Sequence, residues 1–199
     1  MKIGIQAALA ILSIFIAYLI WDSVDSKIVL TESVATRNKV VQQKLEQIRD
    51  AQVEYKKVRG EYAGTFEQLV DFLENDSIVQ VKMEGEVPDS LLGKEAEALR
   101  LGIIIRDTIK IPVREELFKE NFQSFVDSIS YIPFSGGEKF TIAAGELEKG
   151  KMKVKVFEVK APITAVYKGL KTDNEGIDMT LFIAIGSMEE PTTNGNWND

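Results

Sequence analysis

Residues 3–21 contain no charged side chain, and this run constrains the chain more than any other feature of its sequence. Lys2 precedes the run and Asp22 follows it. As an α-helix that rises about 1.5 Å per residue, the run is about 28 Å long, close to the hydrocarbon thickness of a bilayer. We therefore expect residues 1–22 to be a transmembrane anchor, with these side chains in lipid: Ile3, Leu9, Leu12, Phe15, Leu19 and Trp21.

Two other interpretations of this run fit less well. The apolar core of a cleaved signal peptide is shorter, about 7–15 residues, and no Ala-x-Ala pattern follows Trp21. A buried core helix is seldom apolar on all sides over five turns. The rule that positive charge stays inside places Lys2 in the cytoplasm and Asp22 outside it. The sequence thus predicts a single-pass inner (cytoplasmic) membrane protein whose domain lies in the periplasm.

The net charge of the chain indicates which classes of partner it can bind. The chain of 199 residues has a formal net charge of -7, and Lys2 is the one charged residue among the first 21. An acidic domain of this kind repels phosphate backbones, so we expect no nucleic-acid partner. The expected partners are the lipid bilayer through residues 3–21 and other membrane or envelope proteins, including further copies of the chain.

The chain has no cysteine and no histidine, and this limits the bonds, metal sites and catalytic groups that it can form. Disulfides, thiolate nucleophiles and the common zinc sites are excluded, as is the most frequent general base. Asp, Glu, Lys, Ser and Tyr remain for catalysis, but no set of them forms a catalytic motif. We therefore predict a protein that is not an enzyme, with no catalytic residue, cofactor or metal site.

An amphipathic juxtamembrane helix is expected over residues 23–60. Thr31 and Glu32 suit a helix start, and Gly60 suits a C-terminal cap. Apolar residues follow one another at helical spacings and form a stripe. The stripe either packs on its own domain or pairs with a partner in a coiled coil, and its main members are Val34, Val41, Leu45, Ile48 and Tyr55.

The rest of the chain predicts an α+β domain over residues 61–186, with short helices and a mainly antiparallel sheet. Thr65 and Gln68 form a capping box for a second helix. Strands are expected over residues 78–83, 103–113, 128–134, 140–146, 152–160 and 179–185, with a bulge near Phe157. Short helices are expected over residues 94–101, 114–119 and 162–170. Residues 187–199 are polar and predict a flexible tail.

Three segments carry groups that bind ligands in other proteins. Residues 135–137 (Ser-Gly-Gly) could cradle an anion, but they lack the ending of a phosphate loop and favour a turn. Residues 173–178 carry carboxylates without the spacing of a calcium loop, which favours a solvated turn. The glutamate pairs at 146 and 148 and at 189 and 190 favour surface charge over catalysis.

The segment from Tyr55 to Tyr62, which contains Gly60, resembles the end of the long N-terminal helix in type IV pilins and type II secretion pseudopilins. The resemblance covers about residues 3–75 and implies a filament subunit cleaved after Gly4. Those families carry Phe or Met after that glycine and a glutamate four residues further on. This chain has Ile5 and Leu9 at the two positions.

Over its whole length the chain resembles a group of single-pass envelope proteins of Bacteroidota. The shared segments are residues 49–55, 88–90, 106–110, 131–134 and 195–197. This resemblance implies an envelope location and no particular activity. The sequence as a whole predicts a membrane-anchored scaffold or structural subunit of an envelope complex, with a pilin-like filament subunit as the alternative.

Overall fold

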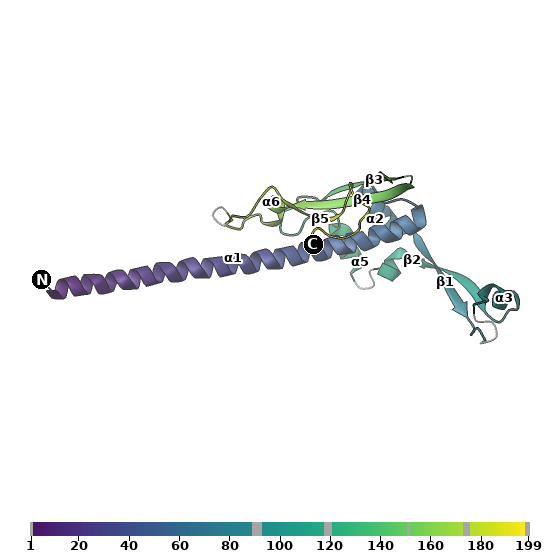
Figure 1. Cartoon of the computed structure of the whole chain (residues 1–199), viewed down its shortest axis with the longest axis horizontal. Coiled ribbons are helices and arrows are strands. Elements are labelled where there is room, and N and C mark those ends of the chain that lie inside the picture. The colour runs from purple at the N-terminus through teal and green to yellow at the C-terminus, as the bar shows by residue number, and fades with distance from the viewer. Residues whose placement is uncertain (1, 89–92, 118–120, 151, 173–175, 198–199) are drawn as a thin grey trace.

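The computed structural model describes residues 2–88, 93–117, 121–150, 152–172 and 176–197. One helix, α1 (Lys2–Arg59), dominates the molecule and is about 87 Å long at about 1.5 Å per residue. The second half of α1 carries a compact body, and its first half projects away from that body (Figure 1). The predicted division between residues 1–22 and 23–60 is therefore absent, because one helix runs through both.

The predicted transmembrane helix is wrong. Across the residues that the structure describes, no helix combines the length and the apolar character that crossing a membrane requires. The apolar run is not a separate spanning element but the first part of a much longer helix, α1, which continues into charged sequence. The single-pass inner-membrane location and the bilayer contact through residues 3–21 depended on that span and are corrected with it.

Two helix boundaries that the sequence predicts, a start at Thr31 and an end at Gly60, can be compared with α1. Gly60 has φ +79° and its N–H donates to the Lys56 carbonyl at 2.8 Å, which confirms the predicted C-terminal cap. Thr31 is not a helix start, because its Oγ1 donates to the Lys27 carbonyl at 2.9 Å from within α1. A hydroxyl that bonds back to the preceding turn is tolerated inside a helix.

Helix α2 (Phe66–Asn75) begins at the predicted capping box. The Gln68 N–H donates to Thr65 Oγ1 at 3.3 Å, and Gln68 Oε1 accepts from the Gly64 N–H at 3.0 Å. The Glu67 backbone N–H and the Thr65 hydroxyl hold the pKa of the Glu67 carboxyl below its usual range. Capping thus orients α2 so that its buried face, with Leu69 and Phe72, packs against α1.

The main sheet contains β3 (Thr141–Lys149), β4 (Met152–Pro162) and β5 (Phe182–Gly186), all antiparallel in that order. The predicted hairpin is confirmed. Its register runs unbroken from Thr141 opposite Lys160 to Lys149 opposite Met152, so the predicted bulge is wrong. The change of phase in β4 has another cause, because Val156 and Phe157 are both buried and the strand is covered on both faces.

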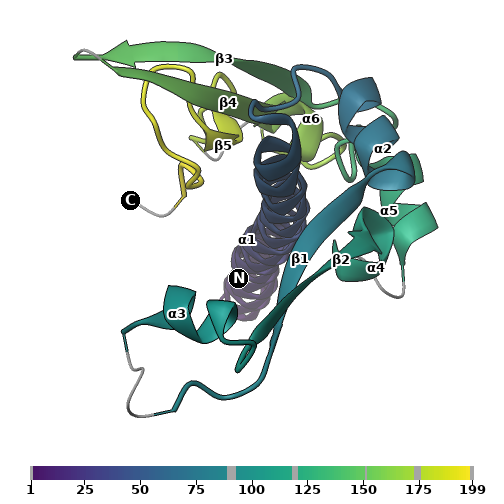
Figure 2. The same cartoon turned by 90° about the vertical axis from the view of Figure 1, so that its right-hand side faces the viewer.

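A two-stranded ribbon forms a separate arm. It pairs β1 (Ser77–Glu84) with β2 (Ile105–Pro112) and carries α3 (Glu95–Arg100) near its tip. The arm extends beyond the C-terminal end of α1, opposite the free first half (Figures 1 and 2). Its tip has a small cluster of its own, where Ala98 and Ile104 are buried.

Two short helices connect the arm to the main sheet, α4 (Val113–Leu117) and α5 (Phe122–Ser128). A third, α6 (Ile163–Val166), lies between β4 and β5. The strand predicted over residues 128–134 is wrong. Phe125, Val126 and Ile129 are buried at helical spacing, so the start of this stretch belongs to α5 and its C-cap, Ile129. Tyr131 makes an isolated bridge to Lys139 beyond it. The helix predicted over residues 162–170 is shorter than expected.

The polar C-terminal segment is held against the sheet as far as residue 197, which corrects the predicted flexible tail. Gly195 forms a bridge to Ile185, and the Gly186 N–H donates to the Asn194 carbonyl at 2.9 Å. Trp197 packs on the main core. The segment therefore covers the outer edge of β5. Residues 198–199 lie outside the described part of the chain.

Candidate functional site: the free half of helix α1

The predicted apolar stripe lies on the side of α1 that faces the body. Val41, Leu45 and Ile48 have no exposed surface, and Val34 and Tyr55 pack partly buried against the same core. The Tyr55 ring meets Phe72 edge to face, with centroids 5.2 Å apart. Of the two interpretations of the stripe, packing on its own domain holds, and these residues are not available to a partner helix.

Polar contacts lock α1 to the body at the level where the free half begins. Arg37 Nη1 donates to the carbonyls of Val166 and Lys168, both at 2.9 Å, and the Tyr167 hydroxyl donates to Asn38 Oδ1 at 2.9 Å. A guanidinium bonded to two carbonyls near the end of α6 fixes the helix in rotation as well as position. The direction in which the free half projects is therefore set by the body.

Lys44 makes a further contact about two turns on. Its Nζ donates to Ser128 Oγ at 2.6 Å and lies 5.2 Å from the centroid of the Phe125 ring. Burial lowers the pKa of the Lys44 ammonium. The contact joins α1 to the end of α5.

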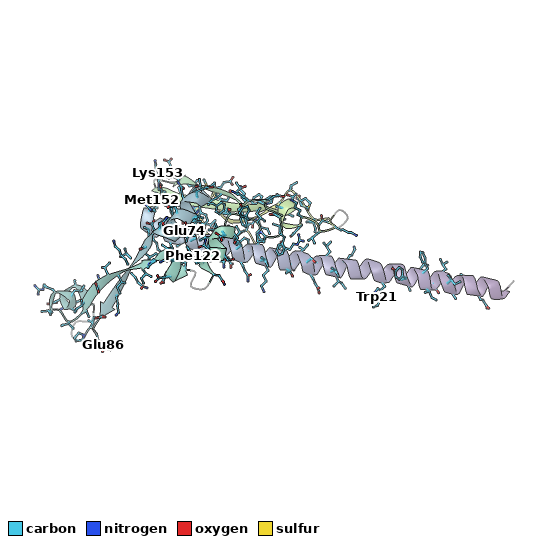
Figure 3. The ribbon with its side chains drawn as sticks, turned by 180° about the vertical axis from the view of Figure 1, so that it is seen from behind. Trp21, Glu74, Glu86, Phe122, Met152 and Lys153 are labelled. Carbon is cyan, nitrogen blue, oxygen red and sulfur yellow. The ribbon has the colours of Figure 1, made fainter. Side chains whose placement is uncertain are left out.

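The body does not cover the described large apolar side chains in the first half of α1. Its large apolar side chains are highly exposed, and Trp21, at 76% exposed, is the extreme among the described large apolar residues (Figure 3). Successive residues on a helix point about 100° apart, so exposure at consecutive positions makes the surface apolar on all sides. The exposed members are Leu9, Ile11, Leu12, Ile14, Phe15, Ile16, Tyr18, Trp21, Ile28 and Val29.

Four of the predicted anchor residues, Leu9, Leu12, Phe15 and Trp21, therefore lie on this exposed surface. Ile3 and Leu19 belong to α1, but their side chains lie outside the described ones. A contiguous apolar surface of this extent on a folded protein marks a site of interaction. We call these exposed apolar side chains between residues 9 and 29 of α1 the free face and treat them as the candidate functional site.

Phe134 stands at the root of the free half. It is the one described non-glycine residue with positive φ, at +66°, and its half-exposed ring lies 5.0 Å from the Arg37 guanidinium carbon. Val29, Glu32, Ser33 and Thr36 complete a shallow groove beside it. The sequence around Pro133 predicts that Tyr131 and Phe134 are core residues, and this prediction is wrong, because both side chains are exposed.

The segments that carry possible ligand-binding groups have local structural roles, which confirms the turn predicted at residues 135–137. Ser135 Oγ donates to the Ile132 carbonyl at 2.7 Å and accepts from the Glu138 N–H at 2.9 Å, so it closes a turn. Residues 173–175 lie outside the described part. Asp178 Oδ1 accepts from the Thr180 N–H and hydroxyl, which lower the pKa of the Asp178 carboxyl.

The glutamates at positions 146, 148, 189 and 190 are all exposed, which confirms the predicted surface charge. Glu146 pairs with Lys155, whereas the Glu189 and Glu190 N–H groups donate to Ser187 Oγ at 3.1 and 3.2 Å. Among the residues that the structure describes, no three acidic side chains converge on a position where a metal ion could bind.

Comparison with known proteins adds no relative: no protein-family model, curated protein or solved structure matches this chain.

Proposed function

We propose that this protein is a structural, non-catalytic subunit of a larger assembly, which it enters by packing the free face of α1 against other copies of the chain. The observation that carries the proposal is the exposure of the free face, where Ile11 and Ile14 are 70% and 71% exposed. Burying one large aliphatic side chain gains about 1.5 to 3 kcal/mol, so a helix with this surface associates.

The shape of the molecule supports this proposal. The second half of α1 packs on the body, and polar contacts through Arg37 and Asn38 hold the first half in a fixed direction. A helix pre-set in its binding direction loses less conformational freedom on association than a flexible segment does. The projecting half is thus a suitable element for joining subunits.

A pilin-like filament subunit is the second candidate. A long N-terminal helix is what that resemblance implies, and in this structure the first half of such a helix projects from the body (Figure 1). This candidate makes two further predictions: cleavage after Gly4 and polymers that shear releases from the cell. Mass spectrometry of the native N-terminus and electron microscopy of sheared material test them.

The test of assembly compares two aspartate variants of equal initial exposure. Ile14→Asp places a charge on the free face, and Met152→Asp places one at the turn between β3 and β4, where the side chain is 70% exposed (Figure 3). We expect the full chain and Met152→Asp to sediment as oligomers and Ile14→Asp to sediment as single chains. Circular dichroism checks that the helix content is equal in all three.

Two results would overturn the proposal. One is a wild-type chain that sediments as a single species of one-chain mass at all concentrations tested. The other is equal loss of assembly in both aspartate variants, which would show that added charge, and not its position on α1, is responsible.

A further inference from the structure

The residues of the free face form a heptad seam that is complementary to itself when two helices run in opposite directions. Residues at alternating spacings of three and four fall on one side of a helix. On this chain one such series is Ile3, Ala7, Ala10, Ile14, Ala17, Trp21, Val24 and Ile28. Asp22, Asp25 and Lys27 all fall outside it, so the seam stays apolar past the uncharged run.

We propose that two copies pair through this seam as an antiparallel two-fold dimer, centred between Ile14 and Ala17; this inference rests on the proposed function. In that register Ala10 lies opposite Trp21 of the second copy, and Ile14 lies opposite its Ala17. Further from the centre, residue 7 lies opposite residue 24 of the second copy, and residue 3 lies opposite its residue 28. Small residues thus face large ones, which lets the helices approach closely and fill the space between them.

The described side chains at the centre of the seam are available for such contact. Trp21 and Ile14 are 76% and 71% exposed, Ile28 is 52% exposed, and Ala10 and Ala17 are exposed as well. An exposed indole and an exposed alanine, brought opposite each other twice by one symmetry axis, form the self-complementary patch that a two-fold interface requires.

The seam also lies on the side of α1 that the body leaves open. Ile14 precedes the fully buried Val41 by 27 residues. At roughly 100° per residue, this separation places Ile14 about half a turn away from the body-facing side. A second helix can therefore run along the seam without meeting the body.

Electrostatics favour the antiparallel direction over the parallel one. Beyond the free run, residues 22–199 contain 23 Lys and Arg against 31 Asp and Glu. Parallel helices would bring two acidic bodies side by side. Antiparallel helices place the bodies at opposite ends, tens of ångströms apart and well beyond the screening length of about 8 Å at physiological salt. Opposed helix dipoles add to this preference.

The size of the contact is that of a stable interface. Residues 3–28 form about 39 Å of helix, and half of the circumference of a helix about 11 Å wide is about 17 Å. The strip covers roughly 660 Å² on each partner, near the roughly 800 Å² per partner of standard interfaces.

Cysteine crosslinking of the full chain tests the register, because the natural sequence contains no cysteine. Ala10→Cys and Trp21→Cys chains of different tag mass are mixed and oxidised. We expect a heterodisulfide in the mixture and no disulfide from either variant alone. In the antiparallel register two copies of residue 10 lie about 16 Å apart along the axis, whereas a disulfide needs Cα atoms within about 7 Å.

Two further pairs of cysteine variants check the register and the position of the seam. Ala7→Cys with Val24→Cys retains Trp21 and is expected to crosslink at the same register. Leu12→Cys with Leu19→Cys is the matched control, at the same level but off the seam, and is expected not to crosslink.

Homodisulfides from Ala10→Cys alone would overturn the antiparallel pairing and support parallel helices. A crosslink confined to the Leu12 and Leu19 pair would overturn the seam. In both cases the proposed function stands, provided that Ile14→Asp still releases single chains. If Ile14→Asp leaves the assembly intact, the proposed function fails as well.

Discussion

The side-chain amide of Gln52 bonds to both backbone groups of Ala63. Its Nε2 donates to the Ala63 carbonyl at 2.8 Å, and its Oε1 accepts from the Ala63 N–H at 2.9 Å. Both residues have no exposed surface. Gln52 belongs to α1 and Ala63 to the loop before α2, so this pair fixes the turn by which the chain folds back on its long helix.

Replacing Gln52 by leucine is expected to destabilise the body. The apolar side chain keeps the volume but leaves a buried N–H and a buried carbonyl without partners, and we expect the free energy of unfolding to fall by about 2 to 4 kcal/mol. Urea unfolding followed by circular dichroism measures it. Gln43→Leu, at an exposed position of the same helix, is the control. Equal effects of the two substitutions would contradict this account.

The β3–β4 hairpin carries a pH-dependent contact. Lys155 Nζ donates to Glu146 Oε1 at 2.5 Å across the two strands. The hydrogen bond from Lys155 lowers the pKa of Glu146, and the same bond raises the pKa of Lys155. Both groups are at the surface, so solvent and salt screen the pair and its contribution is small.

The sign of its pH dependence follows from the direction of the shifts. A carboxyl whose folded pKa is lowered stabilises the fold above its unfolded pKa, and this contribution is lost as pH falls through the folded value. We expect Glu146→Gln to be less stable than wild type near pH 7 and equal to it near pH 2. Urea midpoints at both pH values measure the difference. A gap that persists in acid would contradict the assignment.

Local signals predicted much of the fold. Gly60 and the Thr65–Gln68 capping box act within one turn, and their outcomes do not depend on distant residues. The hairpin between β3 and β4 was predicted for the same reason, since alternation flanks a short turn at Gly150.

The errors arose where distant parts of the chain decide the outcome. The phase change at Phe157 suggested a bulge, but cover on both faces of β4 produces it. The stripe containing Leu45 could not be assigned to its own domain or to a partner, because periodicity does not say what covers a face. The apolar run in the sequence did predict where the free face lies, but the sequence placed its side chains in lipid. Phe134 carried no periodic signal.

Asn196 shows why the C-terminal segment is ordered despite its polar composition. Its N–H donates to the Ala184 carbonyl at 3.0 Å, its Oδ1 accepts from the Ala184 N–H at 3.0 Å, and its Nδ2 donates to the Phe182 carbonyl at 2.9 Å. The residue thus continues the hydrogen bonding of the sheet beside β5. A polar residue that acts through hydrogen bonds produces no pattern of apolar residues, so the sequence did not predict this role.

Asn196→Ala is therefore expected to loosen the C-terminal segment. It removes two side-chain hydrogen bonds, and we expect a loss of about 1 to 2 kcal/mol in the free energy of unfolding. Hydrogen exchange at Ala184 and Ile185 should accelerate. Asn194→Ala serves as the control, because it retains the backbone carbonyl that accepts from Gly186. Unchanged exchange in β5 after the Asn196 substitution would refute this role.

Phe134 provides a test that separates backbone strain from side-chain contact. Its φ of +66° lies in the left-handed region, which costs a residue with a β-carbon roughly 1 to 2 kcal/mol, and its ring stacks on Arg37. Phe134→Ala removes the ring and keeps the strain, whereas Phe134→Gly removes both. We expect the glycine variant to be more stable than the alanine variant by about 1 kcal/mol, measured by urea unfolding. That order reverses the usual advantage of alanine, which restricts the unfolded chain more than glycine does. If alanine were instead the more stable replacement, the turn would relax without its ring, and Phe134 would be held in place by its contact with Arg37 alone.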